Sequence, residues 1–254
     1  MPKHVNSASR LISVISTAAR SNAQHAYQAW AEALGVPQDQ NHFTALGVFE
    51  RLLWVQSEID AVRAGMKIRN YSESLYEPAI SRVQKALQPL QLGVAWQGNG
   101  ASQITGEVLN ALGFCAEILP DEEAELSQDD LASIRALITE IEALLETSTL
   151  PQVLRILLGH HLDLIHTALA RYPVNGISAL RDAAWTATGE MLYLKKHKLA
   201  DGEEDFSARP EVQKLESMWD TVNTTVDGAA KVASVYELGS TLYKAAQALL
   251  NGPS

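Results

Sequence analysis

The chain has 254 residues, and its hydrophobic fraction of 46% is enough to build a folded core and excludes a disordered protein. Its formal net charge of −10 argues against a general nucleic-acid-binding protein, because neutralising phosphates requires clustered lysine and arginine. The single cysteine, Cys115, excludes an internal disulfide and is expected to be a small buried residue.

No apolar run reaches the roughly 18 to 20 residues that a membrane-spanning helix needs, so we expect no membrane segment. The chain carries no acidic residue before Glu32, but the apolar stretch that begins at Leu11 is interrupted by hydroxyl side chains. A secretory signal needs a continuous apolar centre, and an amphipathic first helix fits the pattern better. We therefore expect a cytoplasmic protein.

Apolar residues recur at helical spacing along the whole chain, and no segment shows the alternation of a half-buried strand. The short turns between segments favour an all-α fold, an irregular antiparallel bundle of about eight to nine helices. We expect one domain over residues 1–254, and a division, if there is one, between 93 and 126. In chain order, the pattern predicts helices over residues 7–34, 43–66, 74–89, 102–119, 128–146, 151–171 and 177–198. Residues 211–250 are predicted to form one long helix, or two with a bend near Gly228.

Several details of these helices can be tested. Ser74 with Glu77, and Ser127 with Asp130, have the spacing of a capping box at a helix start. The hairpin 128–171 is expected to organise the bundle, with its second helix as the core because that helix is apolar on most sides. The buried stripe of the helix 43–66 is predicted to consist of Leu46, Phe49, Leu53, Gln56, Ile59 and Val62.

One short stretch holds the residue types that catalysis uses, and its members are His160, His161, Asp163 and His166. Zinc hydrolases place two histidines four residues apart so that both face one metal, whereas His160 and His166 are six apart and diverge. Arg155, Asp163 and His166 share the narrow polar face of this helix. Such a face favours a structural network or an exposed groove. His161 lies on the apolar stripe and is expected to hydrogen-bond inside the core. No metal and no cofactor are expected.

The glycine-rich loop between residues 93 and 106 resembles the start of a phosphate-binding loop. However, Asn99 stands where such a loop has its lysine, and no strand precedes it. We therefore expect no nucleotide there. The loop, which contains Trp96, is either a plain turn or a partner-contacting loop.

Acidic residues are concentrated between Glu117 and Glu146, a segment that contains ten acidic residues and a single basic residue, Arg135. A solvated linker and helix face is the simplest explanation. The functional explanation is a surface that attracts a basic protein, such as a toxin or a nuclease with a positive substrate channel. We define the acidic belt as Asp121, Glu122, Glu123, Glu125, Asp129 and Asp130.

The turn–helix–turn–helix from Leu150 to Leu180, with Tyr172 and Gly176 at its second turn, resembles segments of helical proteins of bacteria and their mobile elements. This resemblance implies a role in conflict between cells or with phage, and it assigns no residue role. The first functional hypothesis is therefore a non-enzymatic binding protein, of the immunity, antitoxin or antiphage-defence kind, that binds a protein partner and neither nucleic acid nor membrane.

Two alternatives stay open at this point. A metal-dependent hydrolase would use His160, Asp163 and His166 together with residues of other helices. A structural homo-oligomer would pack its C-terminal helix against a second copy through the small residues Gly228, Ala229, Ala233 and Gly239.

Overall fold

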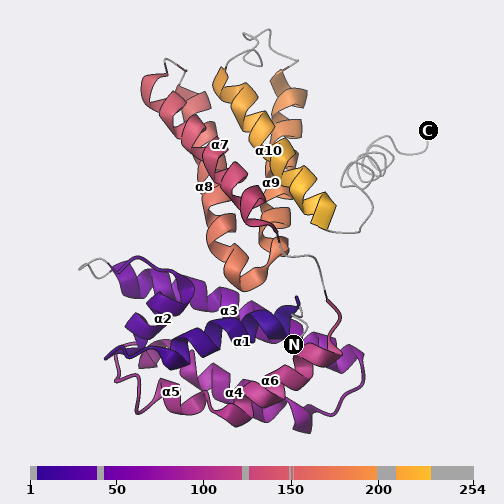
Figure 1. Ribbon diagram of the computed structural model, residues 1–254. Helices are drawn as coiled ribbons and strands as arrows, with labels where there is room; N and C mark the ends of the chain where they lie inside the picture. Colours follow the sequence, from indigo (N-terminus) through magenta and orange to yellow (C-terminus); the bar gives the residue numbers. More distant parts are fainter. Residues whose placement is uncertain are drawn as a thin grey trace, which may run out of the picture. The chain divides into compact units, whose positions relative to one another are not determined.

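The computed structural model describes residues 5–38, 43–121, 126–148, 150, 152–198 and 210–229. Over these residues the chain forms ten α-helices and two short 3-10 helices, and His25 and Ala95 form an isolated β-bridge (Figure 1). The prediction of an all-α fold is therefore confirmed. Among the described helices, none has the length and apolar character needed to cross a bilayer.

The chain divides into two compact units. Unit 1 comprises Met1–Glu122 and Thr167–Ala179, and unit 2 comprises Glu123–His166 and Leu180–Ser254. The helices α8 (Gln152–Asn175) and α9 (Ile177–Lys198) each contribute residues to both units. The expectation of one domain over the whole chain, whose possible division would lie between residues 93 and 126, stays a prediction.

Unit 1 contains six α-helices and the end of the α8–α9 hairpin. Its buried side chains form one continuous hydrophobic core, to which Val174 of α8 also contributes. Trp30, Trp96 and Tyr76 are the largest of these side chains. The elements of this unit are α1 (Ser7–Arg20), α2 (Ala26–Leu34), α3 (Phe43–Ile68), η1 (Glu73–Leu75), α4 (Glu77–Ala86), η2 (Pro89–Gln91), α5 (Gly100–Gln103) and α6 (Gly106–Ile118).

The single helix predicted over residues 7–34 is wrong, because the chain leaves the helical conformation between α1 and α2. The break is held by backbone hydrogen bonds to the segment 92–96. Trp96 N donates to Gln24 O over 3.0 Å, and Ala26 N donates to Val94 O over 3.0 Å. A distant segment therefore satisfies polar groups that a continuous helix would have satisfied internally.

Trp96 is the reason that the segment 92–96 lies there. Its side chain is fully buried, its Nε1 donates to Ala18 O over 3.0 Å, and its ring packs edge-to-face against Trp30 at 5.5 Å. A Cβ atom at Gly100 would overlap the Trp96 ring, so this position requires glycine. Trp96 is thus part of the core of unit 1, whereas its neighbours at 93–95 and 97–99 are exposed, and a partner contact by these loop residues stays a prediction.

The buried stripe predicted for α3 is wrong in its first half. Leu46, Phe49 and Leu53 are exposed, whereas Ile59 and Val62 are buried as predicted. The apolar residues of α3 occupy more than one face, so spacing alone does not select the face that packs against α1 and α2. The buried stripe consists of Val48, Leu52, Val55, Ile59, Val62 and Met66.

Of the two predicted capping boxes, one is confirmed. Ser127 caps α7, and its side chain exchanges hydrogen bonds with Asp130 in the predicted way. Ser74 caps no helix, because it lies in the 3-10 helix η1 and α4 begins only at Glu77. Glu77 instead forms an ion pair with Arg63 of α3, a contact that the local sequence does not encode.

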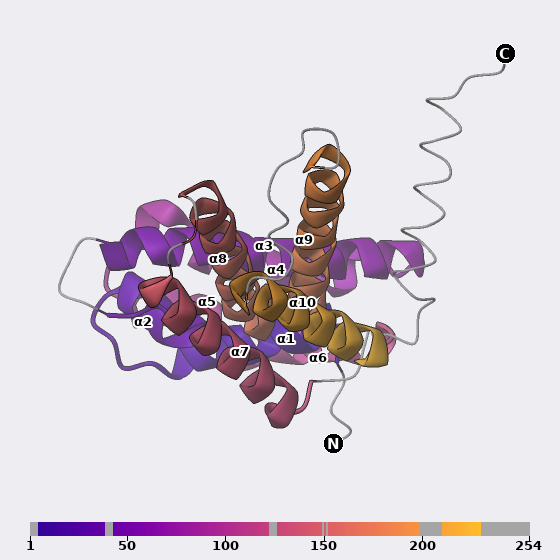
Figure 2. The same ribbon diagram turned by 90° about the horizontal axis from the view of Figure 1, so that it is seen from above.

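Unit 2 is built from α7 (Gln128–Thr147), α8 (Gln152–Asn175), α9 (Ile177–Lys198) and α10 (Pro210–Ala229), which Figure 2 labels. The part of α8 before Thr167 and the part of α9 after Ala179 belong to this unit. The turn predicted at 172–176 is confined to Gly176, which has a φ of 63°, since α8 continues through Pro173. The helix predicted over 211–250 is described only as far as Ala229. Ala233 and Gly239 lie outside the described residues.

The expectation that the helix 151–171 forms the core of the protein is wrong. Leu158, Leu162 and Ile165 are buried, but Ile156 is 64% exposed and Asp163 faces solvent. The large continuous core instead belongs to unit 1. Leucine-rich composition on all sides of a helix did not distinguish a central helix from one with a single buried face.

A buried polar network fixes the end of α8 within unit 1. Arg10 of α1 and Glu58 of α3 form an ion pair with Nη2 and Oε2 2.8 Å apart, and both side chains are largely buried. Asn175 donates from Nδ2 to Glu58 Oε1 over 2.9 Å and to Ser57 Oγ over 3.0 Å. A Cβ atom at Gly176 would lie 3.0 Å from the Arg10 guanidinium, so the left-handed turn residue also leaves room for Arg10.

We expect Asn175→Ala to lower the free energy of unfolding by about 1–3 kcal/mol, because it leaves a buried carboxylate without one of its donors. Urea denaturation followed by far-UV circular dichroism measures the loss. Asn99→Ala is the matched control, since the exposed Asn99 side chain makes one hydrogen bond, to Ala95 O. Equal losses in the two variants would contradict a special role of the buried network.

Candidate functional site

The four polar side chains singled out in α8 do not converge on one site. Arg155 donates to Leu145 O over 3.0 Å and closes the C-terminal end of α7, and His166 Nε2 lies 3.0 Å from Glu142 Oε1, also of α7. His160 Nε2 instead lies 3.1 Å from Glu190 Oε1 of α9. The predicted divergence of His160 and His166 is therefore confirmed.

This geometry bears on the hydrolase alternative. His160 and His166 contact carboxylates of different helices, and Asp163, three residues from each, is exposed. Across the part of the chain that the structure describes, no three His, Cys, Asp or Glu side chains are arranged to hold a metal ion. The three residues of that hypothesis thus offer no common point at which a metal or a substrate could sit.

His161 differs from its neighbours because it is fully buried. Its Nε2 is 3.5 Å from Glu190 Oε2, and its ring packs edge-to-face on Trp219 of α10 at 5.9 Å. Neither ring nitrogen makes a hydrogen bond with a described residue, and the same is true of the buried Glu190 Oε2 and Trp219 Nε1. The prediction that His161 is buried is confirmed, but the prediction that it forms a hydrogen bond in the core is wrong. We call His161, Glu190 and Trp219 the His161 cluster.

Burial also controls the ionisation of two side chains. Removal from water lowers the pKa of His161, and the nearby carboxylate of Glu190 opposes this effect without cancelling it. Burial raises the pKa of Cys115 to about 11, so its thiol stays protonated at neutral pH. The prediction that Cys115 is a buried residue is confirmed.

The acidic belt is only partly described. Glu122, Glu123 and Glu125 lie outside the described residues. Asp121 accepts a hydrogen bond from Val5 N over 2.8 Å, and Asp130 belongs to the capping box of α7. Asp129 is exposed. Two of the three described members thus have structural partners, which the count of acidic residues did not reveal.

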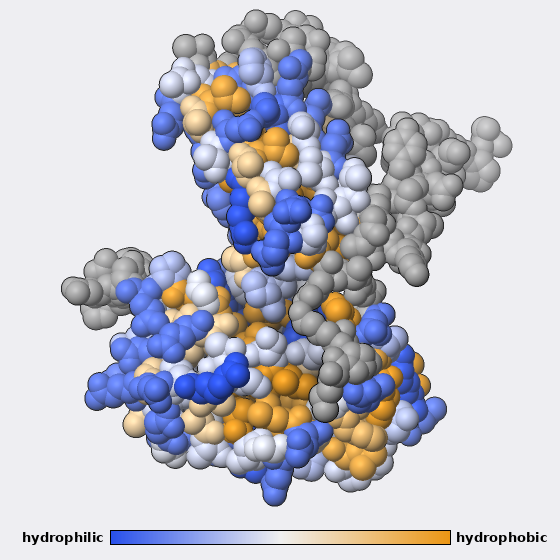
Figure 3. Space-filling view, viewed as in Figure 1, coloured by the Kyte–Doolittle hydropathy of each residue, from blue (hydrophilic) through white to orange (hydrophobic). Residues whose placement is uncertain are grey.

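The negative charge is distributed very unevenly between the two units. Unit 1 has 10 basic and 11 acidic residues, whereas unit 2 has 10 basic and 19 acidic residues, which leaves net charges of −1 and −9. Hydrophilic side chains cover much of unit 2 in Figure 3. On α7, Glu140 pairs with Lys214 of α10 and Glu142 pairs with His166, while Glu146 is exposed.

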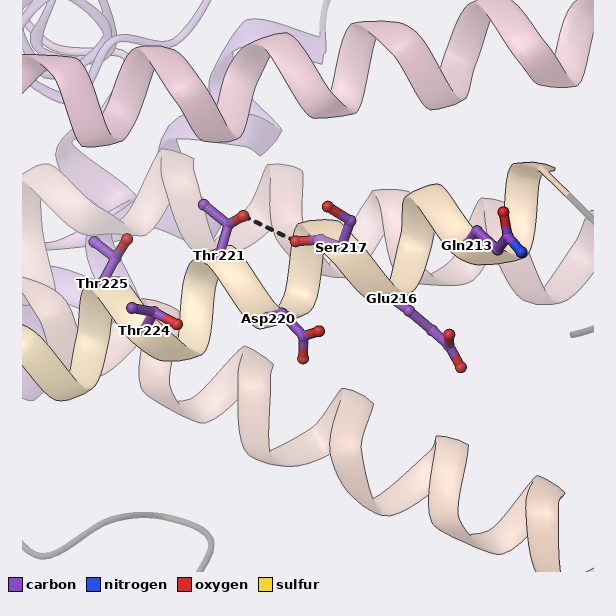
Figure 4. A pocket seen from close by; sticks show the side chains of 7 residues that line it. All are labelled: Gln213, Glu216, Ser217, Asp220, Thr221, Thr224 and Thr225. Atoms are coloured by element: carbon purple, nitrogen blue, oxygen red, sulfur yellow. Dashed lines mark hydrogen bonds between the residues drawn. The ribbon is translucent and has the colours of Figure 1, made fainter. Parts of the chain in front are cut away.

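A polar hollow of about 480 Å³ lies along α10. Figure 4 shows that Glu216 and Asp220 project from one side of this helix and Ser217 and Thr221 from the other, where Thr221 Oγ1 donates to Ser217 O over 2.8 Å. Hydroxyl and carboxylate groups suit hydrogen bonding to a polar partner. The described lining residues are Gln213, Glu216, Ser217, Asp220, Thr221, Thr224 and Thr225.

Unit 1 exposes a cluster of apolar side chains around the end of α3. Asn70 ends that helix in the left-handed conformation, with a φ of 58°, and all residues from 67 to 75 are exposed. Tyr71 packs edge-to-face on Phe114 of α6 at 6.0 Å, and apolar surface is visible over the part of unit 1 that carries α6 (Figure 3). The members, which are 39–77% exposed, are Ile68, Tyr71, Leu75 and Phe114.

Neither this apolar cluster nor the hollow on α10 was predicted from the sequence. The apolar residues Tyr71 and Leu75, which follow the end of α3, can be recognised in the sequence. Whether their side chains are buried or exposed depends on how α6 packs against them, which the sequence does not show. The polar hollow follows a 3-4 spacing along α10, which is a local signal that an analysis centred on apolar residues overlooks.

Comparison of the chain with models of protein families, with curated proteins and with solved structures gives no match.

Two substitutions in α6 test the distinction between its exposed and its buried face. We expect Leu112→Ala to lower the free energy of unfolding by about 2–5 kcal/mol, because Leu112 is fully buried. Phe114→Ala should lower it by less than about 1.5 kcal/mol, since it removes an exposed edge-to-face contact with Tyr71. Urea denaturation compares the two, and a larger loss for Phe114→Ala would place Phe114 in the core.

Proposed function

We propose that this protein is a non-enzymatic binding module that recognises a basic protein partner through unit 2. The observation that carries the proposal is the charge of unit 2, which holds −9 of the chain's −10. A concentrated negative surface attracts positively charged proteins over a distance of about one Debye length and increases their rate of association. Unit 1, with a net charge close to zero, offers no such attraction.

The acidic side chains of α7 support this assignment. Asp129 and Glu146 are exposed. Glu140 and Glu142 are about half exposed even though they pair with Lys214 and His166. Exposed ion pairs of this kind contribute about 0–1 kcal/mol, so a basic partner can replace them at little expense. The three undescribed members of the acidic belt precede α7 directly in sequence and would add to the same attraction.

The biological role that we propose is that of an immunity protein, an antitoxin or an antiphage-defence component in the bacterial cytoplasm. A nuclease or toxin whose active-site channel is positive is the partner whose charge complements unit 2 best. The module would block that channel sterically, without chemistry of its own. The hydrolase alternative is less well supported, because His160 and His166 contact different helices. The homo-oligomer alternative depends on residues from 228 to 239, which lie largely outside the described part of the chain.

The proposal is tested by titrating the purified protein with the products of neighbouring genes at low and high salt. We expect Asp129→Lys/Glu146→Lys to weaken the complex about tenfold or more at low salt, equivalent to about 1.4 kcal/mol, and the difference to shrink as salt is added. The matched control is Glu50→Lys/Glu73→Lys, which makes the same charge change at exposed positions of unit 1.

Equal weakening by the two double variants would contradict a binding face on unit 2. So would a complex whose affinity does not depend on salt, since a partner recruited by charge must respond to screening.

A further inference from the structure

The His161 cluster is the point where three helices of unit 2 bring polar groups together in the interior. His161 comes from α8, Glu190 from α9 and Trp219 from α10. The His161 ring is fully buried, and its nitrogens, together with Glu190 Oε2 and Trp219 Nε1, make no hydrogen bond within the described part of the chain. Asn223, one turn after Trp219, also has a buried oxygen without a hydrogen bond.

This concentration of unpaired polar groups is unusual. The large majority of buried side-chain polar atoms in folded proteins have a hydrogen-bond partner, and an unpaired one destabilises the fold because it loses its hydrogen bonds to water without replacing them. Unit 2 thus contains a weak point at the contact of α8 with α9 and α10. Its packing there rests on the neutral form of His161, because an apolar interior tolerates a neutral imidazole far better than a charged one.

Few charged groups surround His161, and they offer it limited compensation. On its own helix, His160 repels a positive charge. On α9, Glu190 attracts one, but its Oε1 already contacts His160 at 3.1 Å and its Oε2 stays 3.5 Å from His161 Nε2. The side chain that α10 packs against the ring is the neutral Trp219, and the buried ionisable residue of that helix, Glu211, is two turns away. The buried side chains of α7 are apolar: Leu131, Ile134, Ile138 and Ile141.

We propose that the His161 cluster is a pH-sensitive switch, in which protonation of His161 opens the packing of α8, α9 and α10 while unit 1 stays folded. The proton comes from water and adds to a ring nitrogen, which places one positive charge in the interior of unit 2. Glu190 Oε2 attracts that charge across 3.5 Å without a hydrogen bond, and the same carboxylate also contacts His160, so the charge is only partly compensated. The helices relieve the conflict by separating and admitting water.

The direction of the pH dependence follows from the burial of the ring. Folding lowers the pKa of His161 below its ordinary value of about 6.5, so the unfolded chain binds the proton more tightly than the folded one. The contribution to stability is therefore fully present above about pH 6.5. It is lost as the pH falls from there towards the lower pKa of the folded state.

The test is amide hydrogen exchange of the full chain at about pH 7.5 and about pH 5, corrected for intrinsic exchange rates. At the lower pH we expect faster exchange in α8, α9 and α10 over residues 152–166, 180–191 and 210–226. The increase should be about tenfold for each unit by which folding lowers the pKa. The helices α1 to α6 should keep their protection. Equal loss of protection in unit 1 would contradict a local switch.

Two variants assign the effect to one side chain. His161→Leu keeps a neutral side chain in the interior and should abolish the pH response of unit 2. His166→Leu is the matched control, because His166 lies on the same helix, is half exposed and pairs with Glu142. The control should respond to pH as the unsubstituted chain does. A pH response that survives in His161→Leu would overturn the proposal.

A measurement on the unsubstituted chain covers the case in which His161→Leu fails to fold. Nuclear magnetic resonance follows the His161 ring signals during a pH titration, and we expect a midpoint below about 6.5 that coincides with the opening of unit 2. A midpoint at or above that value would overturn the proposal. None of these measurements uses a partner, so failure of the switch and failure of the proposed binding function are distinguishable.

Discussion

Unit 1 depends on the buried ion pair between Arg10 and Glu58. Two charges removed from water stabilise a fold only when their remaining hydrogen-bonding capacity is also satisfied. Asn175, at the end of α8, donates a hydrogen bond to the Glu58 carboxylate. Gly176 has no side chain and so leaves the space that the Arg10 guanidinium occupies. The ion pair therefore specifies which residues must stand at the turn between α8 and α9.

The two units use different interiors. In unit 1 the buried indoles of Trp30 and Trp96 are paired with backbone carbonyls, and the interior polar groups Arg10, Glu58 and Asn175 are bonded to one another. In unit 2 the indole nitrogen of Trp219 and both nitrogens of His161 are buried without such bonds. Buried polar groups that are hydrogen-bonded resist opening, whereas a buried unpaired group that titrates, such as His161, responds to the arrival of a proton. Thr105 Oγ1 of unit 1 is also buried without a hydrogen bond to a described residue, but a hydroxyl does not titrate near neutral pH. This contrast is the physical basis for expecting pH sensitivity in unit 2 alone.

Charge separates the units as clearly as packing does. Nearly all the negative charge belongs to unit 2, although part of it is paired within the unit: Glu140 with Lys214 of α10, Glu142 with His166 of α8, and Asp130 with Ser127 in the cap of α7. The two ion pairs are about half exposed, so they contribute little to stability and their acids remain accessible to solvent. The same helix can thus pair with its neighbours and attract a basic protein. The apolar cluster around Tyr71 gives unit 1 a different surface, which favours contact rather than attraction over distance.

Features that depend only on neighbouring residues could be predicted from the sequence alone. Helical spacing, the capping box of Ser127 with Asp130 and the extent of α7 act within a few residues, so they could be predicted and are confirmed. The buried face of α3, the break in the first helix and the burial of Trp96 in the core could not be predicted in this way. Each of these results from packing between segments far apart in the chain, as in the hydrogen bond from Trp96 to Gln24. The same holds for the candidate sites. The sequence placed His160, His161 and His166 on one helix, but the neighbouring helices determine that His161 is buried without a hydrogen bond to the described part of the chain and that the other two pair with carboxylates at the surface.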